Sequence, residues 1–296
     1  MSGDALSKIL LLVDAGPGSK SAAEVAALLA GATRASVTAL SVADAGTSRS
    51  ATEATLAEAA SALGRAGVSV ETALLGEETA VVDEVVRRAK GGYDLTVLGA
   101  PSRPAPGGGR LSLRLWQLAR SVPTPVLLVP QGAPLEMKRI LLCTGGELYI
   151  EEGLRFTAAL ASALGAAITV LHVLPEPPEL YRDLAARYSS PSGYLAGESR
   201  LARQLRAQMA ALEKRSVPAS LAVEEGDVEN TIFEVANRVE AQLIVVGSSP
   251  ARGPLRSSIL GNVTREIASR SAAPVLIVRS RPAGLLRDLW RILREG

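Results

Sequence analysis

The chain repeats itself, because its second half follows the same pattern of apolar runs, glycines and prolines as its first half. One constant spacing aligns the early parts of the two halves, as three pairs show: Ile9 with Ile140, Val37 with Ile168, and Val42 with Val173. Further along, residues 95–99 match residues 243–247, and residues 125–129 match residues 274–278. A duplication is the most economical explanation of this agreement and of a length of 296 residues, so we expect two copies of one folding unit.

Within each half, short apolar runs alternate with segments of helical spacing. In the first half the expected strands are residues 8–13, 37–42, 68–75, 95–98 and 125–129. Strands that alternate with helices make a parallel sheet covered by helices on both faces. The predicted fold class is therefore α/β, with two tandem doubly wound, Rossmann-like domains. Ligands of such domains bind beyond the carboxyl ends of the strands, which points to the loops after Asp14, Val42 and Gly99 and to their counterparts in the second half.

Three segments are expected, namely a domain over residues 1–131, a domain over residues 135–280 and a C-terminal segment over residues 281–296. The last segment predicts an amphipathic helix, which is too short to be stable alone and needs a surface to dock on. That surface is its own domain, a sister chain or an anionic membrane. Residues 180–214 form an Arg-rich connection that is longer than its counterpart, and it either covers a site, presents a partner surface or is a solvated helix.

Composition excludes several classes of function. A net charge of +2 with 3% aromatic residues does not favour a nucleic-acid partner. The first apolar run, residues 9–13, is too short for a signal peptide or a membrane span, so we expect a cytoplasmic protein. A single cysteine, Cys143, and a single histidine, His172, cannot form an internal disulfide or a Cys/His zinc site. We expect His172 to be structurally paired and Cys143 to be a core residue.

A phosphate-binding loop is predicted in the second half. An apolar strand ends on Gly247, a polar loop with Gly253 follows, and Gly261 opens a helical pattern. The free N–H groups and the dipole of a helix start both favour an anion, and glycines let the backbone approach it closely. The alternative is that Gly247 and Gly253 only turn the loop.

Taken together, four motifs resemble the universal stress protein family in its tandem form. They are KILLLVD at residues 8–14, LHV at residues 171–173, LIVVGS at residues 243–248, and ILGNVTREI at residues 259–267 running into APVLIV at residues 273–278. The resemblance implies a flavodoxin-like fold with strand order 3-2-1-4-5 and dimer contacts through the last strand. In the ATP-binding branch of the family, an aspartate at the end of the first strand helps to hold adenine, and a pattern G-x2-G-x9-G-[ST] holds the phosphates.

Neither half matches the ATP-binding pattern fully. The first half keeps Asp14 and Val42 on the adenine side, but has Ser112 and Leu113 where a glycine and a hydroxyl are expected. Asp14 either contacts a base or instead caps the next helix or binds loop N–H groups. Arg252 of the second half either contacts phosphate or is a solvated surface arginine.

The second half keeps Gly247, Gly253 and Gly261 for the phosphates but loses the aspartate. Pro250 replaces the second glycine of the pattern, Asn262 replaces the hydroxyl residue, and Gly145 lies opposite Asp14. Because charged phosphates meet several N–H donors, we rank the second half as the more favourable ATP site. The candidate binding residues are Asp14, Val42, Thr144, Gly145, Val173, Gly247, Ser248, Ser249, Arg252, Gly253, Gly261, Asn262 and Val263.

The prediction is a stress-response or regulatory protein without catalytic residues or a protein-held metal, whose expected cofactor is ATP with Mg²⁺. The two domains are expected to form an intrachain pseudo-dimer, and two chains to form a homodimer. The alternative is a nucleotide-free scaffold that uses the C-terminal helix and residues 180–214 to bind a protein or a membrane surface. Sequence patterns for catalysis, such as G-x4-G-K-[ST] or G-x-S-x-G, are not found in the chain.

Overall fold

The computed structural model describes residues 6–16, 18–42, 48–75, 81–102, 111–145, 150–174, 195–248 and 261–279. The first half contains β1 (Lys8–Val13), α1 (Ser19–Thr33), β2 (Ser36–Val42), α2 (Arg49–Arg65), β3 (Val70–Leu75), α3 (Val81–Ala89), β4 (Leu95–Ala100), α4 (Leu113–Ser121) and β5 (Val126–Pro130). The second half contains β6 (Arg139–Cys143), α5 (Ile150–Leu164), β7 (Ala167–Leu174), α8 (Arg200–Glu213), β8 (Ala219–Glu225), α9 (Val228–Arg238), β9 (Leu243–Ser248), α10 (Asn262–Arg270) and β10 (Val275–Arg279). The predicted alternation of strands and helices is confirmed in both halves.

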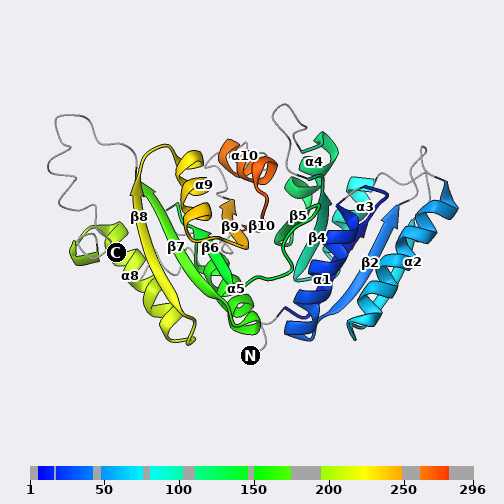
Figure 1. The fold of residues 1–296 in the computed structure, drawn as a ribbon, viewed down its shortest axis with the longest axis horizontal. Coiled ribbons are helices and arrows are strands. Elements are labelled where there is room, and N and C mark those ends of the chain that lie inside the picture. The colour runs from blue at the N-terminus through cyan, green and yellow to red at the C-terminus, as the bar shows by residue number, and fades with distance from the viewer. Residues whose placement is uncertain are drawn as a thin grey trace, which may run out of the picture.

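The strands form one hydrogen-bonded sheet of ten, in the order β3-β2-β1-β4-β5-β10-β9-β6-β7-β8. Each half on its own has only parallel pairs, as the alternation of strands and helices predicted, and the order 3-2-1-4-5, as the family resemblance implied. The two sheets are not separate, because β5 pairs antiparallel with β10 at the centre of the molecule (Figure 1). The duplicated unit is therefore preserved, and its last strand makes the junction.

The junction has an approximate two-fold symmetry. Leu127 pairs with Leu276, its counterpart in the other half, while Val126 pairs with Ile277 and Leu128 pairs with Val275. Such self-complementary pairing is typical of a two-fold dimer interface. The predicted intrachain pseudo-dimer is thus present, and it uses the last strands of both halves.

Apolar side chains fill both faces of the sheet. Strand β1 shows why, because every residue from Ile9 to Val13 is buried, and such a continuous apolar run is typical of a parallel strand between two helical layers. One layer of the core contains Ile9 and Leu11 with residues of α1, α2, α5 and α8. The other contains Leu10 and Leu12 with residues of α3, α4, α9 and α10.

Helix α8 corrects one sequence-based expectation. Residues 180–214 were expected as an insertion, but α8 occupies the place of α2 in the repeat. The same bond follows both helices, from the Val68 N–H to the Leu63 carbonyl and from the Val217 N–H to the Leu212 carbonyl, each at 3.1 Å. Residues 180–194 and the C-terminal residues 281–296 lie outside the described part of the chain.

The linker between the halves is fixed to the first half. The Gln131 N–H donates to the Ala100 carbonyl at 3.0 Å, and the Gly132 N–H donates to Ser21 Oγ of α1 at 3.0 Å. Gly132 has a φ of +74°, a conformation that favours glycine. In the described residues, no helix is long and apolar enough to cross a membrane.

Candidate ligand-binding site

The described part of the first half contains a cavity of about 390 Å³ at the carboxyl ends of β1, β2 and β4. This is where the strand order reverses, since β1 has β2 on one side and β4 on the other. A volume of this size fits a small-molecule ligand. Its lining comprises Leu12, Val13, Asp14, Ala15, Gly16, Gly18, Ser41, Val42, Thr52, Val81, Leu98, Gly99, Ala100, Pro101, Ser112, Arg114, Leu115 and Leu118.

Two glycines allow α1 to begin directly against the end of β4. A Cβ added to Gly18 would lie 2.3 Å from the Ala100 carbonyl oxygen, and one added to Gly99 would lie 2.6 Å from the Gly18 carbonyl carbon. Both contacts are with backbone, which cannot move as a flexible side chain can. These positions therefore need glycine because of the close approach of two backbones, and that approach shapes one wall of the cavity.

Asp14 organises the loop between β1 and α1. Its Oδ1 accepts hydrogen bonds from the Gly16 N–H at 2.9 Å and from the Ser19 hydroxyl at 2.6 Å, while the Asp14 N–H donates to Ser19 Oγ at 3.0 Å. Asp14 thus binds a loop N–H group, which was the structural alternative to base contact. Both bonds end on Oδ1, and Oδ2 has no partner in the described residues. Because Asp14 also lines the cavity, contact with a base remains a prediction.

Helix α4 contributes the other charged group of the lining. Ser112 is its N-cap residue and accepts a hydrogen bond from the Leu115 N–H at 3.1 Å. Arg114, in the first turn, is exposed and lines the cavity. Arg114 was not among the residues predicted from the sequence, although its place at the start of a predicted helix that follows a strand end was a usable signal.

The second half repeats one bond of this site with a different residue. In the first half the Ser41 hydroxyl donates to the Val13 carbonyl at 2.7 Å. At the equivalent positions, His172 Nδ1 lies 2.9 Å from the Thr144 carbonyl oxygen. His172 is buried, and this burial lowers its pKa, whereas the bond to Thr144 raises the pKa by a smaller amount. The expected structural pairing of His172 is present.

The other predicted residues of the second half lie at the same edge of the sheet. Thr144 and Gly145 follow β6, Val173 is in β7, and Gly247 and Ser248 end β9. Gly261 is the N-cap residue of α10, and Asn262 and Val263 are in its first turn. Ser249, Arg252 and Gly253 lie outside the described residues. The ranking of the second half above the first therefore stays a prediction.

The N-termini of α4 and α10 differ in capping. Ser112 and Gly261 hold the same N-cap position in the repeat, but Gly261 provides no side-chain cap for α10, and none is found in the described residues. Its first N–H groups have no partner within the helix and are suited to an external acceptor. The sequence difference between serine and glycine at this position thus has a direct structural effect.

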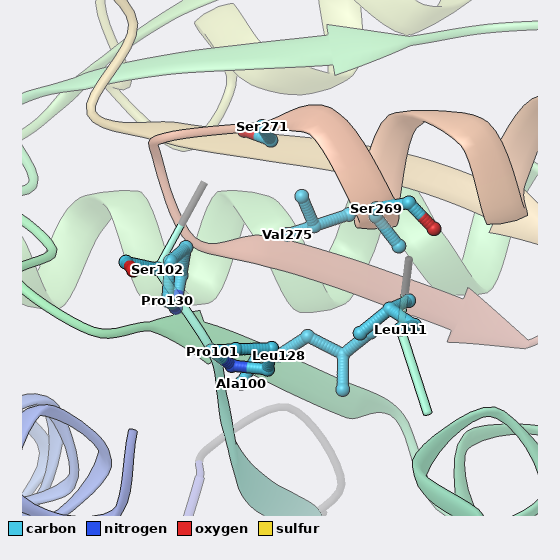
Figure 2. A pocket seen from close by; sticks show the side chains of 10 residues that line it. Ala100, Pro101, Ser102, Leu111, Leu128, Pro130, Ser269, Ser271 and Val275 are labelled. Carbon is cyan, nitrogen blue, oxygen red and sulfur yellow. The ribbon is translucent and has the colours of Figure 1, made fainter. Parts of the chain in front are cut away.

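A second, much smaller hollow lies at the junction of the halves. Figure 2 shows Pro130, Leu128 and Ser102 of the first half facing Ser271 and Val275 of the second. Its volume of about 10 Å³ is close to that of one water molecule. It is too small for an organic ligand.

Metal and thiol chemistry have little support in the described residues. No cluster of His, Cys, Asp or Glu side chains suited to a metal ion is present among them. Burial raises the pKa of the Cys143 thiol to about 12, so the reactive thiolate is disfavoured.

Comparison with known proteins agrees with this geometry. The model of the universal stress protein family matches residues 6–130 and residues 136–279. The chain belongs to the universal stress protein family. It carries the family unit twice, and the fold and strand order described above are those of a tandem member.

One curated relative of this tandem universal stress protein is the stress response protein NhaX of Bacillus subtilis (strain 168). The two are 26% identical over 163 residues, which cover 48% of this chain and 97% of NhaX. A solved universal stress protein from Archaeoglobus fulgidus DSM 4304 superposes with a TM-score of 0.71 at 17% identity, covering 93% of this chain and 98% of that one. A protein of unknown function from Pseudomonas aeruginosa PAO1 gives a TM-score of 0.68 at 21% identity, with 99% of both chains covered. At these identities the two structures show a shared fold.

Proposed function

We propose that this universal stress protein is a regulatory protein that binds an adenine nucleotide at the carboxyl edge of its sheet. The cavity of about 390 Å³ in the first half is the observation that carries the proposal, because it lies at the strand reversal and includes Asp14 and Val42. Apolar residues from β1, β4 and α4 provide a surface for a base, and Asp14 Oδ2 can accept a hydrogen bond from an amino group.

The second half supports the proposal through its phosphate end. The N-cap position of α10 is Gly261, which has no side chain to cap the helix, so within the described residues the N–H groups of the first turn are suited to an anion. We propose ATP as the ligand here. The described residues hold no acidic cluster for a metal, so Mg²⁺ would be bound mainly through the phosphates.

A binding role fits this lining better than a catalytic one. Among the described cavity residues the charged groups are Asp14 and Arg114, and the lining contains no histidine that could activate a hydroxyl such as that of Ser19, which is bonded to Asp14. His172 and Cys143 lie in the other half, where His172 is bonded to backbone and the Cys143 thiol is protonated. We therefore propose that the protein is not an enzyme. Its location in the cytoplasm and its homodimer remain predictions from the sequence.

Titration calorimetry with ATP tests the proposal, together with mass spectrometry of the gently purified chain for bound nucleotide. Gly261→Glu places a carboxylate at the phosphate end of the second half, and Ser112→Glu is the matched change in the first half. Loss of ATP binding in Gly261→Glu with retention in Ser112→Glu would locate ATP in the second half, and the reverse pattern would locate it in the first. An absence of binding heat and of bound nucleotide in the unmodified chain would refute the proposed function.

A further inference from the structure

We infer that His172 is a ligand-binding residue of the second half, where its Nε2 accepts the hydrogen bond that Asp14 accepts in the first half. The inference rests on the proposed function, since it concerns how the second half recognises adenine. It identifies the ligand class as a purine with an amino group at position 6, and it explains how a site without the aspartate can still recognise that group.

The position of His172 follows from the repeat. Ser41 lines the first-half cavity, and its hydroxyl donates to the carbonyl of the last residue of β1. His172 makes the equivalent bond to the carbonyl of the residue after β6. Equivalent bonds on equivalent strands place the two side chains on the same side of the sheet edge. The His172 ring is larger than the serine side chain, so it extends further in the same direction.

The hydrogen bond to Thr144 fixes the tautomer. A carbonyl oxygen can only accept, so Nδ1 must carry the proton. Burial of the ring lowers its pKa and keeps it neutral near pH 7. In a neutral ring with the proton on Nδ1, Nε2 has a free lone pair and is a hydrogen-bond acceptor.

Nε2 also remains accessible. His172 is 6% exposed, and no partner of Nε2 is found in the described residues. Among the described residues, the side-chain nitrogen and oxygen atoms that are both inaccessible to solvent and without a hydrogen-bond partner belong to Gln208. Nε2 of His172 is not one of these atoms, although it has no partner in this part of the chain. The small exposed area of His172 therefore includes this nitrogen, at the edge of the sheet where the ligand of the repeat binds.

The neighbouring sequence change fits the same role. Gly145 replaces Asp14, and a Cβ at Gly145 would have no atom within 4 Å. In the described residues, the second half thus has room for a side chain at this position but lacks the carboxylate that Asp14 supplies in the first half. His172 lies close to this position on the adjacent strand, because it follows Leu171, which pairs with Cys143.

The test compares ATP with ITP, whose base carries a carbonyl oxygen at position 6 in place of the amino group. All proteins carry Asp14→Asn, so that the first half does not contribute its carboxylate. With His172 present, ATP should bind about tenfold more tightly than ITP, because the carbonyl oxygen would face the Nε2 lone pair. Calorimetry with each nucleotide measures this ratio.

Two variants separate binding from structure. His172→Ser copies Ser41, so it can keep the bond to the Thr144 carbonyl while removing Nε2, and the ATP/ITP ratio should fall to about one. Adding Gly145→Asp to His172→Ser copies the first-half pair Asp14 and Ser41, and should restore the ratio. A purely structural histidine would not change the ratio between two nucleotides that differ in one group.

The outcomes distinguish the two proposals. If ATP binds and the ratio is the same with and without His172, the role of His172 is refuted while the proposed function stands. A double variant that binds ATP without regaining the preference also contradicts the inference. If ATP does not bind the second half at all, the proposed site there fails first, and the role of His172 fails with it.

Discussion

The glycines at the ends of β4 and β9 occupy the same position in the repeat but have different surroundings. A Cβ on Gly99 would lie 2.6 Å from the Gly18 carbonyl carbon, whereas a Cβ on Gly247 would have no atom within 4 Å. Within the described part of the chain, the strand end is therefore tightly packed against a helix in the first half and has free space around the glycine in the second. Glycine is therefore sterically required at this position in the first half only.

We predict that Gly99→Ala lowers the free energy of unfolding by about 3 kcal/mol, because two backbone segments would have to separate. The matched variant Gly247→Ala should change it by less than about 0.5 kcal/mol. Urea denaturation followed by circular dichroism measures both. Equal effects of the two substitutions would show that the close contact of α1 with β4 does not constrain the first half.

Gln208 is a second position at which a single residue departs from the repeat. It lies on the core-facing side of α8 and is 5% exposed, and neither its Nε2 nor its Oε1 has a hydrogen-bond partner among the described residues. The bonds that follow α2 and α8 align Leu63 with Leu212, and hence Ala59 with Gln208. The second half thus buries a polar amide where the first half buries a methyl group.

We predict that Gln208→Leu raises the free energy of unfolding by about 1–2 kcal/mol, because it removes the cost of an unsatisfied buried amide and keeps a similar volume. Gln204→Leu, one turn earlier and half-buried, is the control and should have an effect below about 0.5 kcal/mol. Thermal unfolding of the three proteins gives the comparison. A decrease in stability for Gln208→Leu would mean that the amide is satisfied in solution.

At the scale of the elements, α4 and α10 show how one residue changes a helix N-terminus. Ser112 caps α4 through the Leu115 N–H, whereas Gly261 cannot cap the equivalent Thr264 N–H of α10, which has no side-chain partner in the described residues. Stability and anion binding therefore make opposite demands on this position. A capping side chain stabilises the helix but occupies the N–H groups that an anion would need.

We predict that Gly261→Asp stabilises the chain by a few tenths of a kcal/mol and weakens ATP binding by at least about tenfold. Gly261→Ala, which adds a Cβ without a capping group, should lower stability slightly and leave the affinity less affected. Calorimetric titration and urea denaturation of the same preparations provide both values. A substitution that increases stability and affinity together would contradict an anion site at α10.

Most elements could be predicted from the sequence, because hydrophobic periodicity and glycine positions determine them locally. The strands predicted at residues 8–13 and 95–98, for example, were found as β1 (Lys8–Val13) and β4 (Leu95–Ala100). The strand order came from the family resemblance. The prediction that α8 is part of an insertion was wrong. The many arginines of α8 suggested a solvated helix, but the helix has a buried face that includes Leu205 and Leu212.

The candidate site was less predictable than the fold. Its residues on strand ends, such as Asp14 and Val42, follow from the alternation of strands and loops. The features that depend on tertiary packing could not be predicted in this way. They include the approach of Gly18 to Ala100 and the presence of Arg114 in the cavity lining. The bond between His172 and Thr144 needed the register of β6 with β7, which periodicity alone does not supply.

At the scale of the whole molecule, the pairing of β5 with β10 changes which surfaces are available. The family resemblance implied dimer contacts through the last strand, and here the two last strands, β5 and β10, pair with one another within one chain. The outer edges of the sheet are β3 and β8. A homodimer of this protein would therefore need a surface other than the last strands.

The junction is also asymmetric in a way that a true homodimer cannot be. Trp116 and Arg265 hold the same position, since each is the fourth residue after its N-cap, Ser112 or Gly261. The Arg265 guanidinium lies 5.9 Å from the centre of the Trp116 ring, across the two halves. Identical halves would place Trp against Trp or Arg against Arg. Divergence of the two copies has replaced that pair with a cation–π contact, which favours pairing of unlike halves.

We predict a coupling free energy of about 1 kcal/mol between these residues, measured by a double-mutant cycle of Trp116→Leu and Arg265→Met. Loss of the buried Trp116 ring will itself lower the free energy of unfolding. The coupling free energy, and not the effect of either single substitution, therefore measures the contact between the two side chains. Arg270 and Phe233, whose guanidinium and ring are 4.7 Å apart, form a control pair within the second half. If the effects of Trp116→Leu and Arg265→Met simply add, apolar strand pairing alone holds the halves together. If they couple, each copy has become specific for the other, which explains how one duplicated unit could diverge into two different sites without losing its internal partner.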